Sequence, residues 1–118
     1  MIMGIHHVSI LASSEKSIKF YEKLGFVVKF RKERANDIIV LMFGHGMQIE
    51  MFIDDRHPVS PMGLEEPLGV RHFALVVDCL EKTMIELQLD HTDIGTDWQG
   101  IRYCYVVDPD GNQIEFHE

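Results

Sequence analysis

Hydrophobic and polar residues alternate along much of this chain, in runs that have the length of a β-strand. Alternation with a period of two is typical of strands that bury one face and expose the other. In the first half of the chain we expect four strands, at residues 5–11, 26–31, 38–43 and 47–53. The strand at 38–43 is apolar throughout, and the other three alternate. A turn at residues 44–46 would join the last two of these strands.

One segment of the first half has the spacing of a helix. Ser13 or Ser14 can cap its beginning, and Gly25 suits the left-handed position that ends a helix. Its single buried stripe would consist of Ile18, Tyr21 and Leu24. We therefore expect a helix between the first two strands.

The second half of the chain repeats this order of elements. A strand at 70–77 is followed by a helix at 80–89, where Leu80, Met84 and Leu87 share one side. The turn at 108–111 has a proline in the position that favours a hairpin turn. The remaining strands are expected at residues 92–96, 101–107 and 112–117, of which the first is weak. The pattern predicts an α+β fold with the order β-α-β-β-β twice.

An internal repeat supports this duplication. Residues 46–51 read G-x-Q-I-E-x, and residues 111–116 read the same 65 positions later. Upstream, residues 5–11 match residues 70–76 in the same order. Repeats at a fixed spacing indicate duplicated structural units. We predict one domain over 1–118, made of modules 1–53 and 70–118 and a proline-rich linker at 54–69.

Size, charge and cysteine content narrow the classes of function. At 118 residues the chain has the size of one domain. Its net charge of −8 disfavours binding to nucleic acid or to anionic membranes. No apolar run is long enough to span a bilayer, and the first residues lack the basic part of a secretory signal. Cys79 and Cys104 form no C-x-x-C motif, so we expect a reducing, cytoplasmic environment.

Each module contains one histidine and one glutamate that can point into a common hollow. Glu50 is expected on the strand face opposite the helix, and His6 on the same face of the first strand as Val8 and Ile10. His6 precedes Glu50 by 44 residues, and His72 precedes Glu115 by 43. Two imidazoles and two carboxylates suit a divalent Ni, Zn, Co, Fe or Mn ion. The alternative is that the glutamates lie on solvated strand faces and the histidines pack within the fold.

Four motifs resemble the vicinal oxygen chelate superfamily, which contains glyoxalases, bleomycin resistance proteins and dioxygenases. They are Ile-His-His-Val at 5–8, Phe-Tyr-Glu-Lys-Leu-Gly-Phe at 20–26, Gly-Val-Arg-His-Phe-Ala at 69–74 and Asp-Pro-Asp-Gly-Asn-Gln-Ile-Glu at 108–115. The resemblance covers the whole chain. It implies two βαβββ modules whose paired mixed sheets form a metal-binding cleft.

The resemblance also implies a ligand set. Glyoxalase I-like members use a His-Glu-His-Glu set, and the matching positions here are His6, Glu50, His72 and Glu115. In similar proteins the first ligand lies fifteen residues before the tyrosine of a Phe-Tyr pair, which selects His6 over its neighbour His7. One divalent metal per site, of uncertain identity, and a homodimer that completes the site are implied as well. Closure of the site within one chain is the alternative.

The implied activity is that of a lyase or isomerase similar to lactoylglutathione lyase. Glu115 would move a proton through a metal-stabilised enediolate, and Glu50 would be a ligand or second base. Glyoxalase I has an arginine and an asparagine that hold glutathione where this chain has Ile10 and Asp54. We therefore expect a small hydroxy-carbonyl compound or its thiol adduct as substrate. The alternatives are a binding module for a drug or metal chelate, or a dioxygenase or thiol transferase of the same fold.

Overall fold

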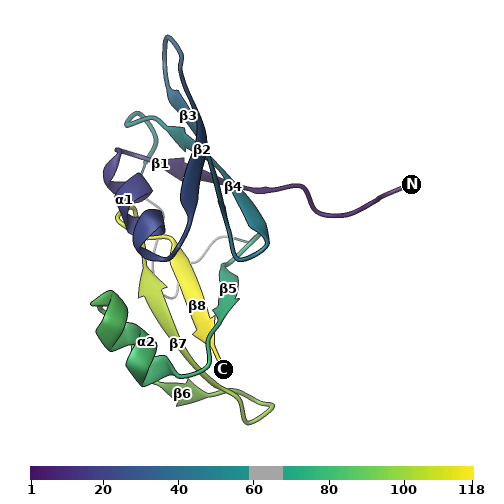
Figure 1. Cartoon of the computed structure of the whole chain (residues 1–118), viewed down its shortest axis with the longest axis vertical. Helices are drawn as coiled ribbons and strands as arrows, with labels where there is room; N and C mark the ends of the chain where they lie inside the picture. The colour runs from purple at the N-terminus through teal and green to yellow at the C-terminus, as the bar shows by residue number, and fades with distance from the viewer. Residues whose placement is uncertain (59–67) are drawn as a thin grey trace. The chain divides into compact units, whose positions relative to one another are not determined.

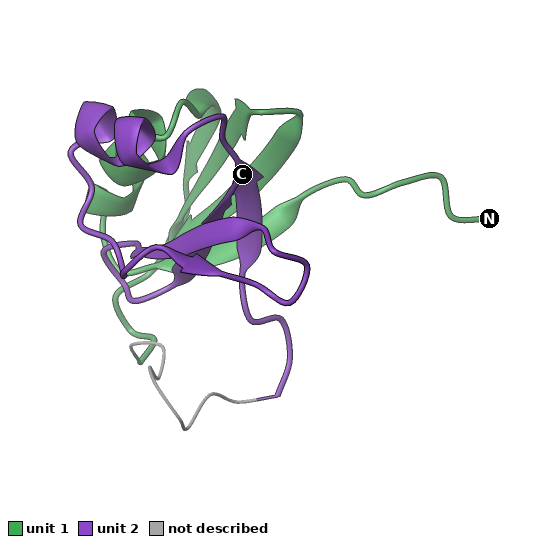
Figure 2. Cartoon of the chain, turned by 90° about the horizontal axis from the view of Figure 1, so that it is seen from below, with its two compact units in different colours: residues 1–58 green, residues 59–118 purple. Residues whose placement is uncertain are grey.

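A computed structural model describes residues 1–58 and 68–118 of the chain. The chain divides into two compact units, residues 1–58 (unit 1) and 59–118 (unit 2), which Figure 2 shows in different colours. The predicted linker at 54–69 falls mostly on residues 59–67, which lie outside the described residues. The predicted module boundaries therefore stay a prediction.

Unit 1 is a mixed four-stranded sheet with one helix (Figure 1). The strand order is β1-β4-β3-β2, in which β1 runs parallel to β4 and the other neighbours are antiparallel. The elements are β1 (Val8–Ala12), α1 (Lys16–Lys23), β2 (Val27–Glu33), β3 (Ile38–Gly44) and β4 (Met47–Ile53).

Unit 2 has the same topology. Its sheet has the order β5-β8-β7-β6, in which β5 runs parallel to β8 and the other neighbours are antiparallel. Its elements are β5 (Phe73–Val76), α2 (Leu80–Leu87), β6 (Gly95–Thr96), β7 (Arg102–Val107) and β8 (Gln113–His117). The twofold β-α-β-β-β order predicted from the sequence is confirmed.

Both first strands begin later than the hydrophobic pattern predicts. Pairing of β1 with β4 begins at Val8 opposite Ile49, and pairing of β5 with β8 begins at Phe73 opposite Ile114. In this register Ile5 and Val70 would lie opposite Gly46 and Gly111, in the turns that precede β4 and β8, where there is no ladder to join. Residues 5–7 and 70–72 lie just outside the strands.

Helix α1 covers one face of the unit 1 sheet, as its apolar stripe predicts. The predicted cap at Ser13 or Ser14 is wrong, because the N-cap is Glu15, although Ser14 accepts the Lys16 N–H at 3.3 Å. Gly25 has a φ of 98° and ends the helix in the left-handed region, as predicted. The buried apolar residues of unit 1 are Ile10, Ala12, Ile18, Tyr21, Leu24, Phe26, Val40, Met42, Ile49, Met51 and Ile53.

His45 closes the C-terminal end of α1 from the β3–β4 turn. Its Nε2 lies 2.6 Å from the carbonyl oxygen of Leu24, and its ring packs edge-on against Phe26 with centroids 5.3 Å apart. Helix carbonyls at this end have no partner within the helix. We expect His45→Ala to lower the free energy of unfolding by about 1 kcal/mol, the net value of one hydrogen bond. Urea denaturation at pH 7 measures this, and an unchanged midpoint would contradict it.

The turn before β8 is organised by a buried carboxylate. Asp108 accepts the N–H groups of Asp110 and Asn112, each at 2.9 Å, and Gly111 has a φ of 89°. The backbone N–H of Asp108 also donates to the carbonyl oxygen of Asn112 at 2.9 Å. These contacts fix where β8 begins, and thereby which face of the sheet each of its side chains occupies. The buried apolar residues of unit 2 are Leu80, Met84, Cys104, Val106, Ile114 and Phe116.

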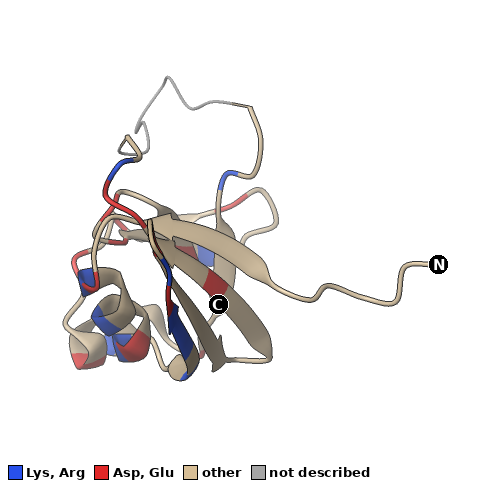
Figure 3. Ribbon diagram, turned by 90° about the horizontal axis from the view of Figure 1, so that it is seen from above, with Lys and Arg blue, Asp and Glu red and all other residues tan. Residues whose placement is uncertain are grey.

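The surface is mixed in charge, and the helices are short. Lys and Arg are interspersed with Asp and Glu along the described chain (Figure 3). Within residues 1–58 and 68–118, neither helix has the length and apolar character that crossing a membrane requires.

Candidate functional site

Glu50 lies on the face of the unit 1 sheet opposite the core, as predicted. Its neighbours Ile49 and Met51 are completely buried, whereas Glu50 keeps 26% of its side chain exposed. The expectation that Val8 and Ile10 lie on the same face as Glu50 is wrong. Ile10 is buried at 8% exposure and pairs with Met51 on the core side. Ser9 is the residue that pairs with Glu50. Two-residue alternation then places His7, and not His6, on the side of Glu50.

The contacts in unit 1 agree with this alternation. The Nε2 atom of His7 lies 3.5 Å from Oε2 of Glu50. His6 touches His7 instead, with their Nδ1 atoms 2.9 Å apart and their rings edge-to-face at 5.1 Å between centroids. The structure therefore brings Glu50 together with His7, and His6 contacts the imidazole of His7 instead of Glu50. The assignment of His6 as a ligand stays a prediction.

Unit 2 contains the equivalent pair. The Nε2 atom of His72 lies 3.6 Å from Oε2 of Glu115, and the two side chains are 21% and 18% exposed. The His72 ring packs edge-on against Tyr105, which lies on β7 directly opposite Glu115 on β8. Nδ1 of His72 is buried without a hydrogen-bond partner among the described residues. The predicted pair of His72 and Glu115 is thus brought together within this unit.

The two pairs occupy the same places in the repeat. His72 follows His7 by 65 residues, and Glu115 follows Glu50 by the same 65. In each unit the histidine lies two residues before the residue of β1 or β5 that pairs with the glutamate. Each unit therefore presents one imidazole and one carboxylate in matching register.

The separation within each pair suits two ligands of one metal ion. At 3.5 and 3.6 Å, the nitrogen and oxygen atoms are too far apart for a good hydrogen bond. Two ligand atoms that each lie about 2.1 Å from one ion are about 3.0 to 3.4 Å apart. The residues present thus fit a divalent cation.

Asp54 directly follows β4. It occupies the position that the family resemblance assigns to a glutathione-binding asparagine. Its side chain is only 6% exposed, and Arg56 donates to both of its oxygens, at 2.8 and 2.6 Å. The side-chain hydrogen bond from Arg56 holds the pKa of Asp54 well below its usual value. This carboxylate is therefore paired within unit 1 and adds no unbalanced negative charge.

This pairing predicts how stability depends on pH. Because the folded pKa of Asp54 is lowered, its contribution to stability is present above the unfolded pKa of about 4 and is lost as the pH falls toward the folded pKa. We expect Asp54→Asn to lower the free energy of unfolding at pH 7, and the difference from the original protein to shrink at pH 3. Urea denaturation at both values measures this. An equal difference at both would contradict it.

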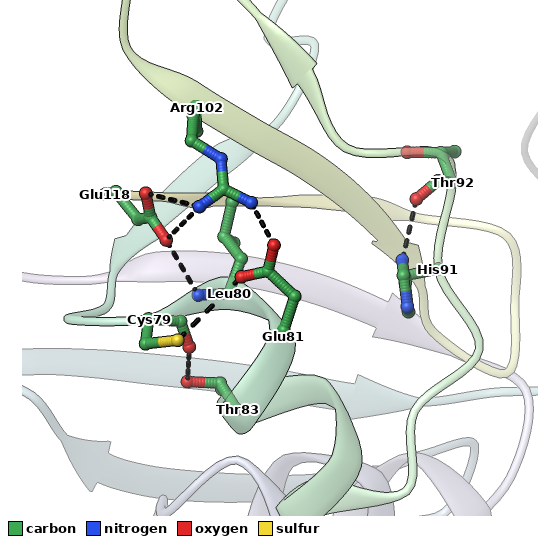
Figure 4. A network of polar contacts seen from close by, with 8 residues as sticks. All are labelled: Cys79, Leu80, Glu81, Thr83, His91, Thr92, Arg102 and Glu118. Atoms are coloured by element: carbon green, nitrogen blue, oxygen red, sulfur yellow. Dashed lines mark hydrogen bonds and ion pairs between the residues drawn. The ribbon is translucent and has the colours of Figure 1, made fainter.

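A second group of potential ligands lies at the start of α2 (Figure 4). Ligand atoms of Cys79, Glu81 and Glu118 lie within 4.8 Å of one another. Arg102 pairs with both glutamates and donates to both oxygens of Glu118 at 3.3 Å, while Glu118 accepts the Leu80 N–H at 2.9 Å. The hydrogen bond from Arg102 lowers the pKa of Glu81. One guanidinium already pairs with both carboxylates, so this group ties Glu118 to the start of α2.

The comparison with known proteins decides the family. The family model of the Glyoxalase/Bleomycin resistance protein/Dioxygenase superfamily matches residues 4–116. The chain belongs to this superfamily. The resemblance seen in the sequence motifs is thereby confirmed, and so is the fold of βαβββ modules.

Relatives within the superfamily cover nearly the whole chain. A glyoxalase family protein from Enterococcus faecalis is 34% identical, with a TM-score of 0.87 over 98% of this chain and 97% of that one. Glyoxylase I 4 of Arabidopsis thaliana is 28% identical over 97% of this chain and 70% of that protein. FosX from Listeria monocytogenes, solved with Mn(II), shares the fold at 13% identity, with a TM-score of 0.76 over 99% of this chain and 93% of that one. Superfamily members commonly bind a divalent metal and act on small molecules.

Proposed function

We propose that this protein is a glyoxalase I-like lyase or isomerase that depends on a divalent metal. The observation that supports this most is the pair of His–Glu contacts at 3.5 and 3.6 Å, one in each unit at matching positions. The matching register follows from the repeat itself, which gives both units the same pair of side chains. Two ligands from each unit on a shared ion would give the two pairs a common role.

The proposed ligands are His7, Glu50, His72 and Glu115. His7 takes the place first assigned to His6 because it contacts Glu50 and aligns with His72 in the repeat. The ion would be Ni, Zn, Co, Fe or Mn, all of which accept imidazole and carboxylate ligands. A homodimer in which each site takes one pair from each chain, or closure within one chain, would bring the pairs together.

Glu115 is the proposed catalytic base. Its carboxylate lies beside His72 with 18% of its side chain exposed, so substrate can approach it. It would take the proton from the carbon next to the substrate carbonyl and return it to the neighbouring carbon. Glu50 would hold its place as a ligand or act as a second base. A bound divalent cation would supply Lewis-acid stabilisation of the charge that develops on the substrate oxygens.

The substrate would be a small hydroxy-carbonyl compound or a thiol adduct of an oxoaldehyde. With His7 as the ligand, the position four residues later is Leu11, which is apolar and 52% exposed. The alternative ligand His6 gives Ile10, which is buried. Neither supplies the guanidinium that glyoxalase I uses for glutathione, so another thiol or a free hydroxy-carbonyl compound is favoured.

A substrate panel on the metal-loaded protein tests this function. Methylglyoxal would be offered with glutathione and with other small thiols, together with hydroxy-ketones and acyl thioesters. We expect turnover that requires added metal and proton exchange with solvent at the substrate carbon. Consumption of oxygen with a catechol would replace the proposal by a dioxygenase. Tight binding of a metal chelate without turnover of any compound would replace it by a binding protein.

A further inference from the structure

Gln113 begins strand β8 on the same face of the sheet as Glu115. Gln113 pairs with Val107 on β7, and Glu115 pairs with Tyr105 on the same strand. Residues two apart on a strand point to the same side and are about 7 Å apart. The preceding turn is held by Asp108, which fixes the start of the strand. The amide of Gln113 is therefore a fixed neighbour of the proposed base.

The oxygen of this amide is buried and has no partner. Oε1 of Gln113 accepts no hydrogen bond from any of the described residues. Nearly all buried polar groups in folded proteins are hydrogen-bonded, because leaving one unpaired costs stability. Such an exception needs a compensating reason. Groups that are kept unpaired in the free protein are often those that meet a ligand.

The repeat shows that the module does not need this unpaired group. Gln48 holds the equivalent position in unit 1, 65 residues earlier. Its side chain contributes no atom that is both buried and unpartnered in the described part of the chain. The two faces also differ around the glutamates. Beside Glu50 lie Leu41 and Phe52, whereas beside Glu115 lie Tyr105 and His117. The face around Glu115 is thus the more polar of the two.

We propose that Gln113 is a specificity-determining residue whose side-chain carbonyl accepts a hydrogen bond from a hydroxyl group of the substrate. This inference rests on the proposed function in one respect, namely that substrate reaches Glu115. It assigns to Gln113 the recognition of the hydroxyl group that the proposed hydroxy-carbonyl substrate carries. A compound that lacks this donor leaves Oε1 desolvated and unpaired, and is discriminated against for that reason.

The variant Gln113→Leu tests the inference in two ways. In the metal-free full-length chain we expect its thermal midpoint to equal or exceed that of the original protein, because no hydrogen bond is lost and an unpaired polar group is removed. In the metal-loaded chain we expect the dissociation constant for glycolate, an unreactive compound whose protonated hydroxyl lies beside a carboxyl group, to rise about 10- to 100-fold. The control is Gln48→Leu, for which we expect an unchanged dissociation constant.

The outcomes separate this inference from the proposed function. If no compound of the panel turns over but Gln113→Leu still weakens glycolate binding, the function is wrong and the specificity role stands. For active protein, a raised KM with little change in kcat supports the role, since Gln113 would bind substrate and transition state alike. A lowered thermal midpoint with unchanged binding would make Gln113 structural and overturn the inference. Failure of the original protein to bind glycolate would overturn it too.

Discussion

Replacement of Glu115 by glutamine is expected to reduce turnover by about 10²- to 10⁴-fold, the range that general base catalysis contributes. Glutamine has nearly the same size and keeps an oxygen near His72, but it does not take up a proton. Glu115 stands on β8 between the buried residues Ile114 and Phe116, which the substitution leaves in place. The fold and much of the metal affinity should therefore remain. Steady-state kinetics and exchange of the substrate proton with solvent measure the effect.

A matched carboxylate provides the control for this substitution. Glu86 is exposed on α2, where the Lys82 ammonium lies 3.9 Å from its carboxylate. Glu86→Gln should keep normal turnover, since exposed pairs of this kind contribute little. Normal turnover by Glu115→Gln would remove Glu115 from the role of base. Equal loss in Glu50→Gln would show that both glutamates are needed, either as ligands or as bases.

The second large effect is expected at the neighbouring histidines His6 and His7. His7→Ala should weaken binding of the divalent metal by more than about 100-fold, because it removes a ligand and not only a group that supports one. His6→Ala should change it only a few-fold, since His6 contacts the ring of His7 and not Glu50. Titration of metal-free protein with Zn²⁺ or Ni²⁺ in a calorimeter measures both constants.

Two further variants frame this comparison. His72→Ala should match His7→Ala, because the two histidines hold equivalent positions in their units. His91→Ala is the control, since His91 lies exposed after α2 and its ring nitrogen is 2.7 Å from the Thr92 carbonyl oxygen. If His6→Ala abolished binding and His7→Ala did not, the sequence-based assignment of His6 would be restored.

Most of the fold could be predicted because burial follows the hydrophobic pattern closely. The run at 47–53 became β4 at the predicted residues, with Ile49, Met51 and Ile53 buried. Strand ends were harder to predict, because they depend on where the partner strand begins. Ile5 looks like a strand residue, yet it has no ladder to join, since β4 begins only at Met47. Local pattern cannot show such a limit set by pairing.

The candidate site was predicted in part. Glu50, His72 and Glu115 were placed by motif and alternation, and two of these, His72 and Glu115, contact each other as expected. The error at β1 came from treating Val8 and Ile10 as the open face, although two apolar positions in alternation mark the buried face. The repeat of residues 5–11 on 70–76 aligns His7 with His72, and this signal was available in the sequence.

Other features depend on contacts between distant segments. Arg102 on β7 pairs with Glu81 on α2 and with Glu118, which follows β8. No spacing in the sequence indicates that these three residues come together. The unpaired oxygen of Gln113 is equally invisible to pattern, because Gln48 has the same sequence context. In both cases the packing of side chains decides, and packing is not encoded in local periodicity.

The metal content of the reconstituted protein tests the central claim most directly. The chain would be loaded with Ni²⁺, Zn²⁺, Co²⁺, Fe²⁺ or Mn²⁺, freed of excess ion by gel filtration, and analysed by atomic emission together with His72→Ala. The account predicts one tightly held ion per chain, in a monomer or a dimer alike, and its loss in the variant. Protein that retains none of these ions, or a variant that keeps the full amount, would contradict it.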